Sequence, residues 1–149
     1  MKKDLFGFEN QGKKYDQFRP KYPSSLLKKA VEKTKNKNRY LDIATGTGQI
    51  LFEIAHHFDE SKGVDYSPKM ISVCEEKLNE LSSDQISFEV CDFVKWDTKE
   101  KYSLITIGQA LHWFPIEESL LKMNEILEKD GTLGVYGYIF KEFRDSDGN

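Results

Sequence analysis

The sequence is poor in cysteine and has no long apolar run, and each shortage excludes a class of protein. Its two cysteines, Cys74 and Cys91, form neither a CxxC pair nor a Cys/His cluster. A disulfide framework and a zinc site are therefore not expected, and both side chains should be free thiols. No apolar run approaches the roughly 18 residues of a membrane span. Residues 1–16 contain no apolar stretch and do not resemble a signal peptide, so a cytoplasmic protein is expected.

Positive charge is not in excess either. The chain of 149 residues has a net charge of −3, so no general attraction to nucleic acid or to a membrane surface is expected. Lysines cluster at 13–14 and across 28–39, which is more typical of a solvated helix face and loop than of a binding patch. The length predicts one domain, residues 1–149, that can bury a core without disulfides. Pro20 and Pro23 oppose a regular helix, so residues 1–23 are expected to form an N-terminal segment.

Apolar periodicity divides the rest of the chain into alternating strands and helices. The predicted helices are 23–35, 49–58, 67–81 and 116–128, and the predicted strands are 39–44, 61–67, 85–93, 102–110 and 131–140. Ser24 or Ser25 can cap the first helix, and Ser67 with Pro68 begins the third. Residues 94–101 are too short for more than a turn. The order predicts an α/β fold with a doubly wound parallel sheet of about five strands.

Ligands of such sheets bind beyond the carboxyl ends of the strands, where this sequence places a glycine turn and a carboxylate. Gly46 and Gly48 follow the first strand and let a ligand approach without Cβ obstruction. Asp65 ends the next strand and could accept hydrogen bonds from both hydroxyls of a ribose. The alternative is a plain strand-to-helix loop, which a glycine pair alone would not exclude. Asp65 favours a nucleotide site.

The turn does not match the two commonest nucleotide fingerprints. The dinucleotide pattern G-x-G-x-x-G/A meets Leu51 at its third place, and a large residue there hinders tight helix packing. A P-loop is excluded because no Gly-Lys-Ser/Thr follows. Asp42, just before the turn, suits a ligand with an ammonium group better than one with several phosphates.

Three acidic positions together resemble the class I S-adenosylmethionine-dependent methyltransferases. The first motif of that family is an acidic residue before a glycine-rich turn, and here it reads "DIATGTG", residues 42–48. Ala44 stands where a glycine is common. Asp65 matches the acidic end of the second strand, and Asp92 the polar position that meets the adenine amino group. The resemblance implies the cofactor S-adenosyl-L-methionine and a Rossmann-like fold.

A closer resemblance is carried by "YDQFRPKYP", residues 15–23, and "GQALHWFP", residues 108–115. Both look like the trans-aconitate methyltransferase-like (methyltransferase type 11) group. The resemblance implies that Tyr15 and Arg19 lie over the cofactor, with Arg19 suited to its carboxylate. The remaining residues expected to border the cofactor are Tyr66, Met70, Phe93 and Gln109.

Several of these residues have a plain structural alternative. Asp92 could simply cap a turn. His112 could be a general base, but a structural histidine is at least as consistent with the pattern. Trp113 and Phe114 could line the active site or be core aromatics at a helix start. The adjacent pair at 56–57 sits at a helix end with a spacing unsuited to chelation, so no metal is expected.

The resemblance implies methyl transfer, with O-methylation of a small molecule such as a carboxylic acid as the first expectation. One alternative is a cofactor-binding domain or subunit without independent activity, and another is a methyltransferase acting on RNA or protein. Members of the family usually continue past the fifth strand with more helix and an antiparallel hairpin, which this sequence lacks. It is therefore expected to be naturally truncated, cut short, or completed by a partner. An open edge at the fifth strand predicts a homodimer, a covering tail or a partner subunit.

Overall fold

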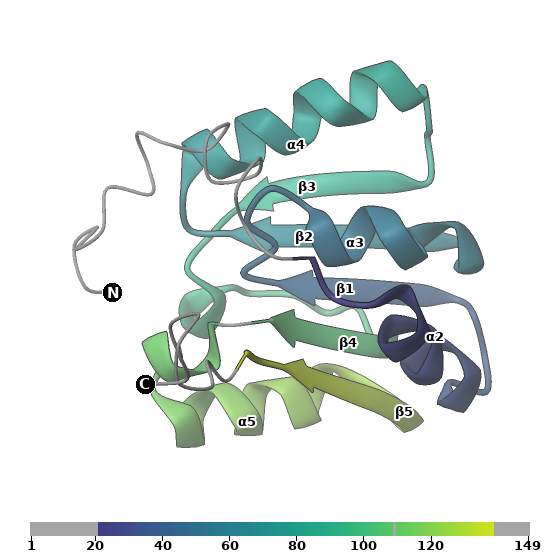
Figure 1. The fold of residues 1–149 in the computed structure, drawn as a ribbon. Helices are drawn as coiled ribbons and strands as arrows, with labels where there is room; N and C mark the ends of the chain where they lie inside the picture. The colour runs from purple at the N-terminus through teal and green to yellow at the C-terminus, as the bar shows by residue number, and fades with distance from the viewer. Residues whose placement is uncertain (1–20, 109, 139–149) are drawn as a thin grey trace, which may run out of the picture.

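Five parallel strands form one sheet, in the order β3-β2-β1-β4-β5 (Figure 1). The computed structural model describes residues 21–108 and 110–138, except the side chain of His112. The strands are β1 (Arg39–Ile43), β2 (Glu60–Asp65), β3 (Ile86–Val90), β4 (Tyr102–Gly108) and β5 (Leu127–Tyr136). Every neighbouring pair is parallel. The predicted fold class, a doubly wound α/β sheet of five strands, is confirmed.

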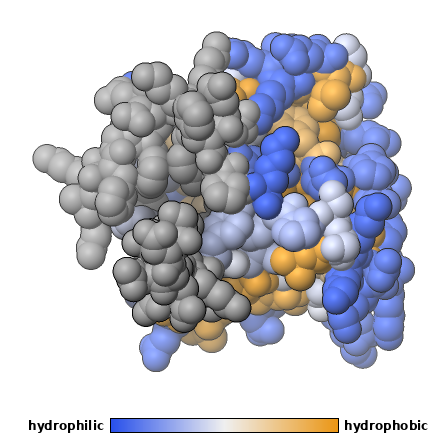
Figure 2. All heavy atoms as spheres, in the orientation of Figure 1, coloured by the Kyte–Doolittle hydropathy of each residue, from blue (hydrophilic) through white to orange (hydrophobic). Residues whose placement is uncertain are grey.

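Within the described residues, three α-helices cover one face of the sheet and one α-helix covers the other. The α-helices are α2 (Ser24–Lys33), α3 (Gln49–Ile54), α4 (Pro68–Leu81) and α5 (Ile116–Ile126). Three single 3-10 turns are η2 (Ala55–His57), η3 (Phe93–Lys95) and η4 (Leu111–Trp113). Helices α2, α3 and α4 lie on one face, which we call the first face, and α5 with η3 lies on the second (Figure 1). The outward sides of the helices in view are largely hydrophilic (Figure 2).

The core follows directly from strand alternation, because successive side chains of a strand point to opposite faces. Tyr40 of β1 and Leu104 of β4 face α2 and α3, while Leu41 and Ile105 face α5. All four are fully buried. Since β1 is followed by a helix on the first face and β4 by a helix on the second, the sheet changes winding direction between these two strands. Ligands of doubly wound folds bind at such a switch point.

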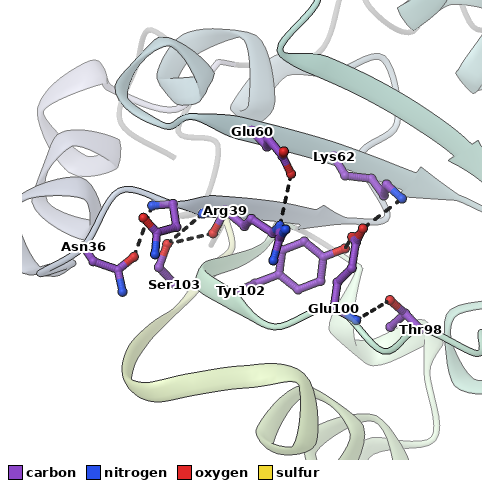
Figure 3. A network of polar contacts seen from close by, with 9 residues as sticks. Asn36, Arg39, Glu60, Lys62, Thr98, Glu100, Tyr102 and Ser103 are labelled. Carbon is purple, nitrogen blue, oxygen red and sulfur yellow. Dashed lines mark hydrogen bonds and ion pairs between the residues drawn. The ribbon is translucent and has the colours of Figure 1, made fainter.

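No α-helix connects β3 to β4, in agreement with the short linker in the sequence; the connection contains only the 3-10 turn η3. A polar network with one tryptophan covers the second face there. Trp96 is buried and donates from Nε1 to Glu89 Oε1 at 3.0 Å. Lys62 Nζ lies 5.7 Å from the centre of the Trp96 ring. Lys62 Nζ also lies 3.6 Å from Glu89. It lies 3.9 Å from Glu100, which accepts a hydrogen bond from Tyr102 (Figure 3). These side chains take the place of the missing helix.

Two predicted details near helix ends are wrong. The last helix was predicted to reach residue 128 and the last strand to begin at 131, but α5 ends at Ile126 and β5 begins at Leu127. Leu127 already pairs with Tyr102, and the register then shifts before Leu104 pairs with Thr132, with Asp130 at a φ of 64° inside the shift. At the start of α2 the N-cap is Pro23, without a side-chain cap, so neither predicted serine caps that helix.

Other local predictions are confirmed. Ser67 is the N-cap of α4, and its hydroxyl accepts a hydrogen bond from the backbone N–H of Met70 at 3.3 Å. Pro68 occupies the first turn of that helix. The described part of the chain contains no helix long and apolar enough to cross a bilayer.

The role of Trp96 as a substitute for the missing helix can be measured. Replacing it with alanine should lower the free energy of unfolding by about 3–5 kcal/mol, the cost of truncating a buried tryptophan. Trp96→Phe keeps most of the apolar contact and loses the bond to Glu89, so it should cost clearly less. Urea unfolding of the two variants checks this. A loss below about 1 kcal/mol for Trp96→Ala would contradict the packing argument.

Candidate functional site at the carboxyl edge of the sheet

The glycine turn after β1 is built from left-handed backbone positions. Ala44, Gly46 and Gly48 have φ values of 52°, 58° and 82°. Left-handed backbone is rarely adopted by residues with a side chain, so Ala44 is the strained member of the three. The N–H of Thr45 donates to the carbonyl of Val64 in β2 at 3.0 Å, which fastens the turn to the neighbouring strand.

Gly48 is required by space as well as by conformation. A Cβ at this position would lie 2.6 Å from the ring of Phe52 and 3.4 Å from Cys74 Sγ. Its N–H donates to the carbonyl of Thr45 at 2.9 Å, closing the turn just before α3 begins. Glycine at position 48 is therefore required by the packing of the turn, and the predicted close approach of a ligand stays a prediction.

Asp42 is a buried carboxylate whose two oxygens each accept a hydroxyl hydrogen bond. It is 2% exposed. Thr45 Oγ1 donates to Oδ2 at 2.7 Å, and Thr106 Oγ1 donates to Oδ1 at 2.6 Å. Tyr40 Oη lies 2.8 Å from Thr106 Oγ1 and, since that hydroxyl donates to Asp42, acts as its donor. Burial raises the pKa of Tyr40, and the negative charge of Asp42 raises it further.

Gly63, on the neighbouring strand β2, makes room beside this carboxylate. Asp42 pairs in register with Gly63 of β2 and with Thr106 of β4, and Thr106 pairs with Gly134 of β5. A Cβ on Gly63 would lie 3.0 Å from Cγ2 of Thr45. A Cβ on Gly134 would lie 3.4 Å from Cγ2 of Thr106. The distance at Gly134 is an ordinary contact, whereas at Gly63 a side chain would crowd both Thr45 and the Phe88 ring, which a Cβ would meet at 2.8 Å.

Asp65, at the end of β2, lies against the glycine turn as predicted. Its Oδ2 accepts from the N–H of Gly46 at 2.8 Å, and its Oδ1 accepts from the N–H of Ser67 at 2.9 Å. The side chain is half-buried. A carboxylate has about four acceptor positions, and these two amides use one on each oxygen. The carboxylate expected to meet a ribose is therefore held rigidly at the turn.

Asp92 caps η3, which was the structural alternative to a cofactor contact. Its Oδ1 accepts from the N–H of Val94 at 3.2 Å. This hydrogen bond uses one acceptor position of Oδ1. The contact of Asp92 with adenine stays a prediction. The preceding residue, Cys91, donates its N–H to the carbonyl of Asp65 at 2.9 Å, which brings the ends of β2 and β3 together.

The environment of Cys91 reports the charge of this edge. Burial raises the pKa of the Cys91 thiol to about 12, and the nearby carboxylates of Glu89, Asp92 and Asp65 add to the shift. The thiol stays protonated in the neutral range and is not a nucleophile. Glu89, Asp92 and Asp65 bring negative charge to this edge, which complements a cationic ligand better than a polyphosphate.

The other predicted site residues are spread between surface and core. Tyr66 and Trp113 are 45% and 40% exposed, whereas Met70 and Phe93 are buried. Phe93 makes an edge contact with the ring of Phe114, so Phe114 is a core neighbour at the start of α5. Tyr15, Arg19, Gln109 and the side chain of His112 lie outside the described residues. Contacts of all these residues with a cofactor stay predictions.

The described residues fit a nucleoside with an uncharged ribose and a cationic group. The turn contains glycines in left-handed conformation, the neighbouring strand ends in an oriented carboxylate, and the carboxylates of Glu89, Asp92 and Asp65 lie near Cys91. No group of three or more potential metal ligands occurs within residues 21–108 and 110–138.

Comparison with known proteins identifies the family to which this chain belongs. The model of the methyltransferase domain matches residues 34–140. The chain is 32% identical over 138 residues to a protein of Saccharomyces cerevisiae named a probable S-adenosylmethionine-dependent methyltransferase, with 88% of this chain and 46% of that protein covered. The chain therefore belongs to the methyltransferase domain family.

Solved structures share the fold. An S-adenosylmethionine-dependent methyltransferase from Clostridium acetobutylicum superposes with a TM-score of 0.73 at 21% identity, covering 85% of this chain and 55% of that one. A coclaurine N-methyltransferase bound to N-methylheliamine and S-adenosylhomocysteine superposes with a TM-score of 0.65 at 21% identity, covering 74% and 34%. The chain spans about half the length of the curated relatives it matches, which it covers to 46%, 49% and 51%.

Sequence reasoning missed the residues that hold the acidic groups in place. Thr45 and Thr106 bond Asp42, and Cys74 and Lys77 of α4 bond carbonyls of the glycine turn. A signal existed for Thr106, a hydroxyl within the otherwise apolar run "LITI". Its pairing with Asp42, however, depends on the register of two strands 64 residues apart, which no local pattern reveals.

The importance of the Asp42 contacts can be tested at Thr106. Thr106→Val keeps the shape but leaves Asp42 Oδ1 and the Tyr40 hydroxyl each without this partner, so the free energy of unfolding should fall by about 1–3 kcal/mol. Thr106→Ser keeps the hydroxyl and serves as the matched control. Urea denaturation of both variants is the measurement. Equal stability of Thr106→Val and Thr106→Ser would show that the hydroxyl contributes nothing.

Proposed function

We propose that this chain is the cofactor-binding part of a methyltransferase that transfers a methyl group from S-adenosylmethionine to an oxygen of a small molecule, such as a carboxylic acid. The observation that carries the cofactor assignment is the bond between Gly46 N–H and Asp65 Oδ2 at 2.8 Å. It joins the glycine turn to the carboxylate best placed for a ribose. The match to the methyltransferase domain over residues 34–140 supports the same reading.

The residues of the chain would hold and orient the cofactor. When bound, S-adenosylmethionine supplies a methyl group on a positively charged sulfur that is a good leaving group. Gly46 and Gly48 allow close approach to the turn, and Asp65 would accept from the ribose hydroxyls. Asp92 would meet the adenine, while Asp42 keeps the turn in position through Thr45. Correct alignment and exclusion of water account for most of the rate enhancement expected in such a reaction.

A carboxylic acid is a suitable acceptor because its oxygen is already ionised at neutral pH and needs no general base. His112 and Trp113 would then line the acceptor site, with His112 available as a base for an acceptor that must lose a proton. Arg19 would bind the carboxylate of the cofactor. The segments "YDQFRPKYP" and "GQALHWFP" support placing the chain near the trans-aconitate methyltransferase-like group.

Two other functions are less well supported. A cofactor-binding domain or subunit without independent activity is the second candidate. Turnover of a panel of carboxylic acids distinguishes it from the first. An RNA methyltransferase is disfavoured by the net charge of −3.

The ribose assignment predicts the effect of one substitution. Asp65→Ala should weaken binding of both S-adenosylmethionine and S-adenosylhomocysteine by about 1–3 kcal/mol, since both carry the ribose. Calorimetry with each compound is the measurement. Asp84→Ala, at an exposed loop position, is the matched control and should bind like the wild type. Unchanged affinity of Asp65→Ala would refute the ribose assignment. A folded wild type that binds neither compound would refute the proposed function itself.

We also propose that the β5 edge is covered by a second copy of the chain or by a partner subunit. Within the described residues β5 pairs only with β4, and it exposes Leu133 and Val135 to 37% and 51%. The neighbouring helix α5 exposes three more apolar side chains, Ile116, Leu120 and Leu121. An unpaired strand edge beside exposed apolar side chains tends to associate.

This association predicts a concentration-dependent dimer. Val135→Lys places a charge on the exposed face of β5 and should shift the equilibrium toward monomer, with little change in stability because the side chain is already exposed. Sedimentation velocity at micromolar concentrations compares this variant with the wild type. A monomeric wild type would exclude the homodimer and leave a partner subunit or a covering tail.

A further inference from the structure

Two side chains of α4 reach across to the glycine turn and bind consecutive carbonyls. Cys74 Sγ donates to the carbonyl of Gly46 at 3.2 Å, and Lys77 Nζ donates to the carbonyl of Thr47 at 2.8 Å. Residues three apart in a helix lie on the same side, so one stripe of α4 carries both donors. Cys74 is buried and Lys77 is half-buried.

These two bonds fix the orientation of the turn's peptide planes. In a planar trans peptide the C=O and the following N–H point in opposite directions. Drawing the carbonyls of Gly46 and Thr47 toward α4 therefore turns the N–H groups of Thr47 and Gly48 away from that helix. The N–H of Gly48 in turn donates to the carbonyl of Thr45 at 2.9 Å. The conformation of the turn is thus set partly by a helix that follows it by 20 residues.

The ammonium group of Lys77 lies close to an aromatic ring as well as to the carbonyl of Thr47. Its Nζ lies 5.8 Å from the centre of the Phe52 ring, the ring against which a Cβ at position 48 would collide. A hydrogen bond from an ammonium to a carbonyl is stronger than one between neutral groups. Ordering a lysine side chain costs up to about 2 kcal/mol of conformational entropy, so its contacts with Thr47 and Phe52 offset that cost.

The same connection links the turn to Asp65. Helix α4 begins three residues after Asp65, whose carboxylate binds the N–H of Gly46. The residue Gly46 is therefore held through its N–H by the end of β2 and through its carbonyl by Cys74. A displacement of α4 would change both the turn and the carboxylate expected to bind the ribose.

We propose that Lys77 is a positioning residue for cofactor binding, acting through the carbonyl of Thr47. It holds the glycine turn in the conformation that accepts the cofactor and does not itself contact the reacting atoms. This inference rests on the proposed function for its effect on affinity, whereas its effect on the turn is independent of any ligand.

The experiment compares three lysine variants. Lys77→Met keeps the apolar stem and removes the donor, Lys77→Arg restores a cationic donor, and Lys29→Met is a matched control at an exposed lysine of α2. Affinity for S-adenosylhomocysteine is measured by calorimetry. Amide hydrogen exchange at Thr47 and Gly48 is measured without ligand, and urea unfolding reports global stability.

Lys77→Met should weaken binding about tenfold, the equivalent of one charge-assisted hydrogen bond, and should accelerate exchange at Thr47 and Gly48. Lys77→Arg should recover most of the affinity, and Lys29→Met should match the wild type in both readouts. Rescue by arginine separates positioning of the turn from a general loss of packing. If Lys77→Met does not fold, Cys74→Ala removes the other donor and should change exchange in the same direction.

Two results would overturn the inference. One is wild-type affinity together with wild-type exchange in Lys77→Met, and the other is weakened binding that arginine does not restore. A wild type that fails to bind S-adenosylhomocysteine would refute the proposed function instead. In that case the exchange rates at Thr47 and Gly48 still decide whether Lys77 positions the turn.

Discussion

The structure depends on one buried carboxylate, Asp42, which ties together the two central strands and the glycine turn. Its oxygens accept hydroxyl hydrogen bonds from Thr45 in the turn and from Thr106 in β4, at 2.7 and 2.6 Å. A buried carboxylate with no partner would cost several kcal/mol, so these two donors contribute to the stability of the fold. Because β1 and β4 flank the point where the sheet reverses its winding, this contact also fixes the place at which a ligand can bind.

From that point the site is assembled by parallel pairing. The ends of β1, β2 and β3 meet at one edge, which brings Asp65 within 2.8 Å of the turn and joins Cys91 to the carbonyl of Asp65. Helix α4 then binds the turn from the other side. Each component comes from a different part of the sequence. Among the described residues, strand pairing and the contacts of α4 bring these components together. Burial raises the pKa of Cys91 at this edge, and the nearby carboxylates of Glu89, Asp92 and Asp65 contribute to the increase.

The parts of the fold that local patterns determine could be predicted from sequence. Apolar periodicity located the strands and helices, and Ser67 with Pro68 marked the start of α4. The placement of Asp65 beside the glycine turn followed from the position of both after buried strands. The contacts of Asp42 could not be predicted, because they depend on strand register over 64 residues. The start of β5 was missed for a similar reason, since pairing with Tyr102 overrides the helix signal at residues 127 and 128.

The central claim is that a methyltransferase cofactor binds at the carboxyl edge between the glycine turn and Asp65. The most direct measurement is a titration of the isotopically labelled chain with S-adenosylhomocysteine, followed by backbone amide chemical shifts. The account predicts the largest changes at residues 44–48 and 65–67, and smaller ones at 91–93. Absence of any change would contradict it, as would changes confined to the opposite edge of the sheet, around Asn36 and Glu128.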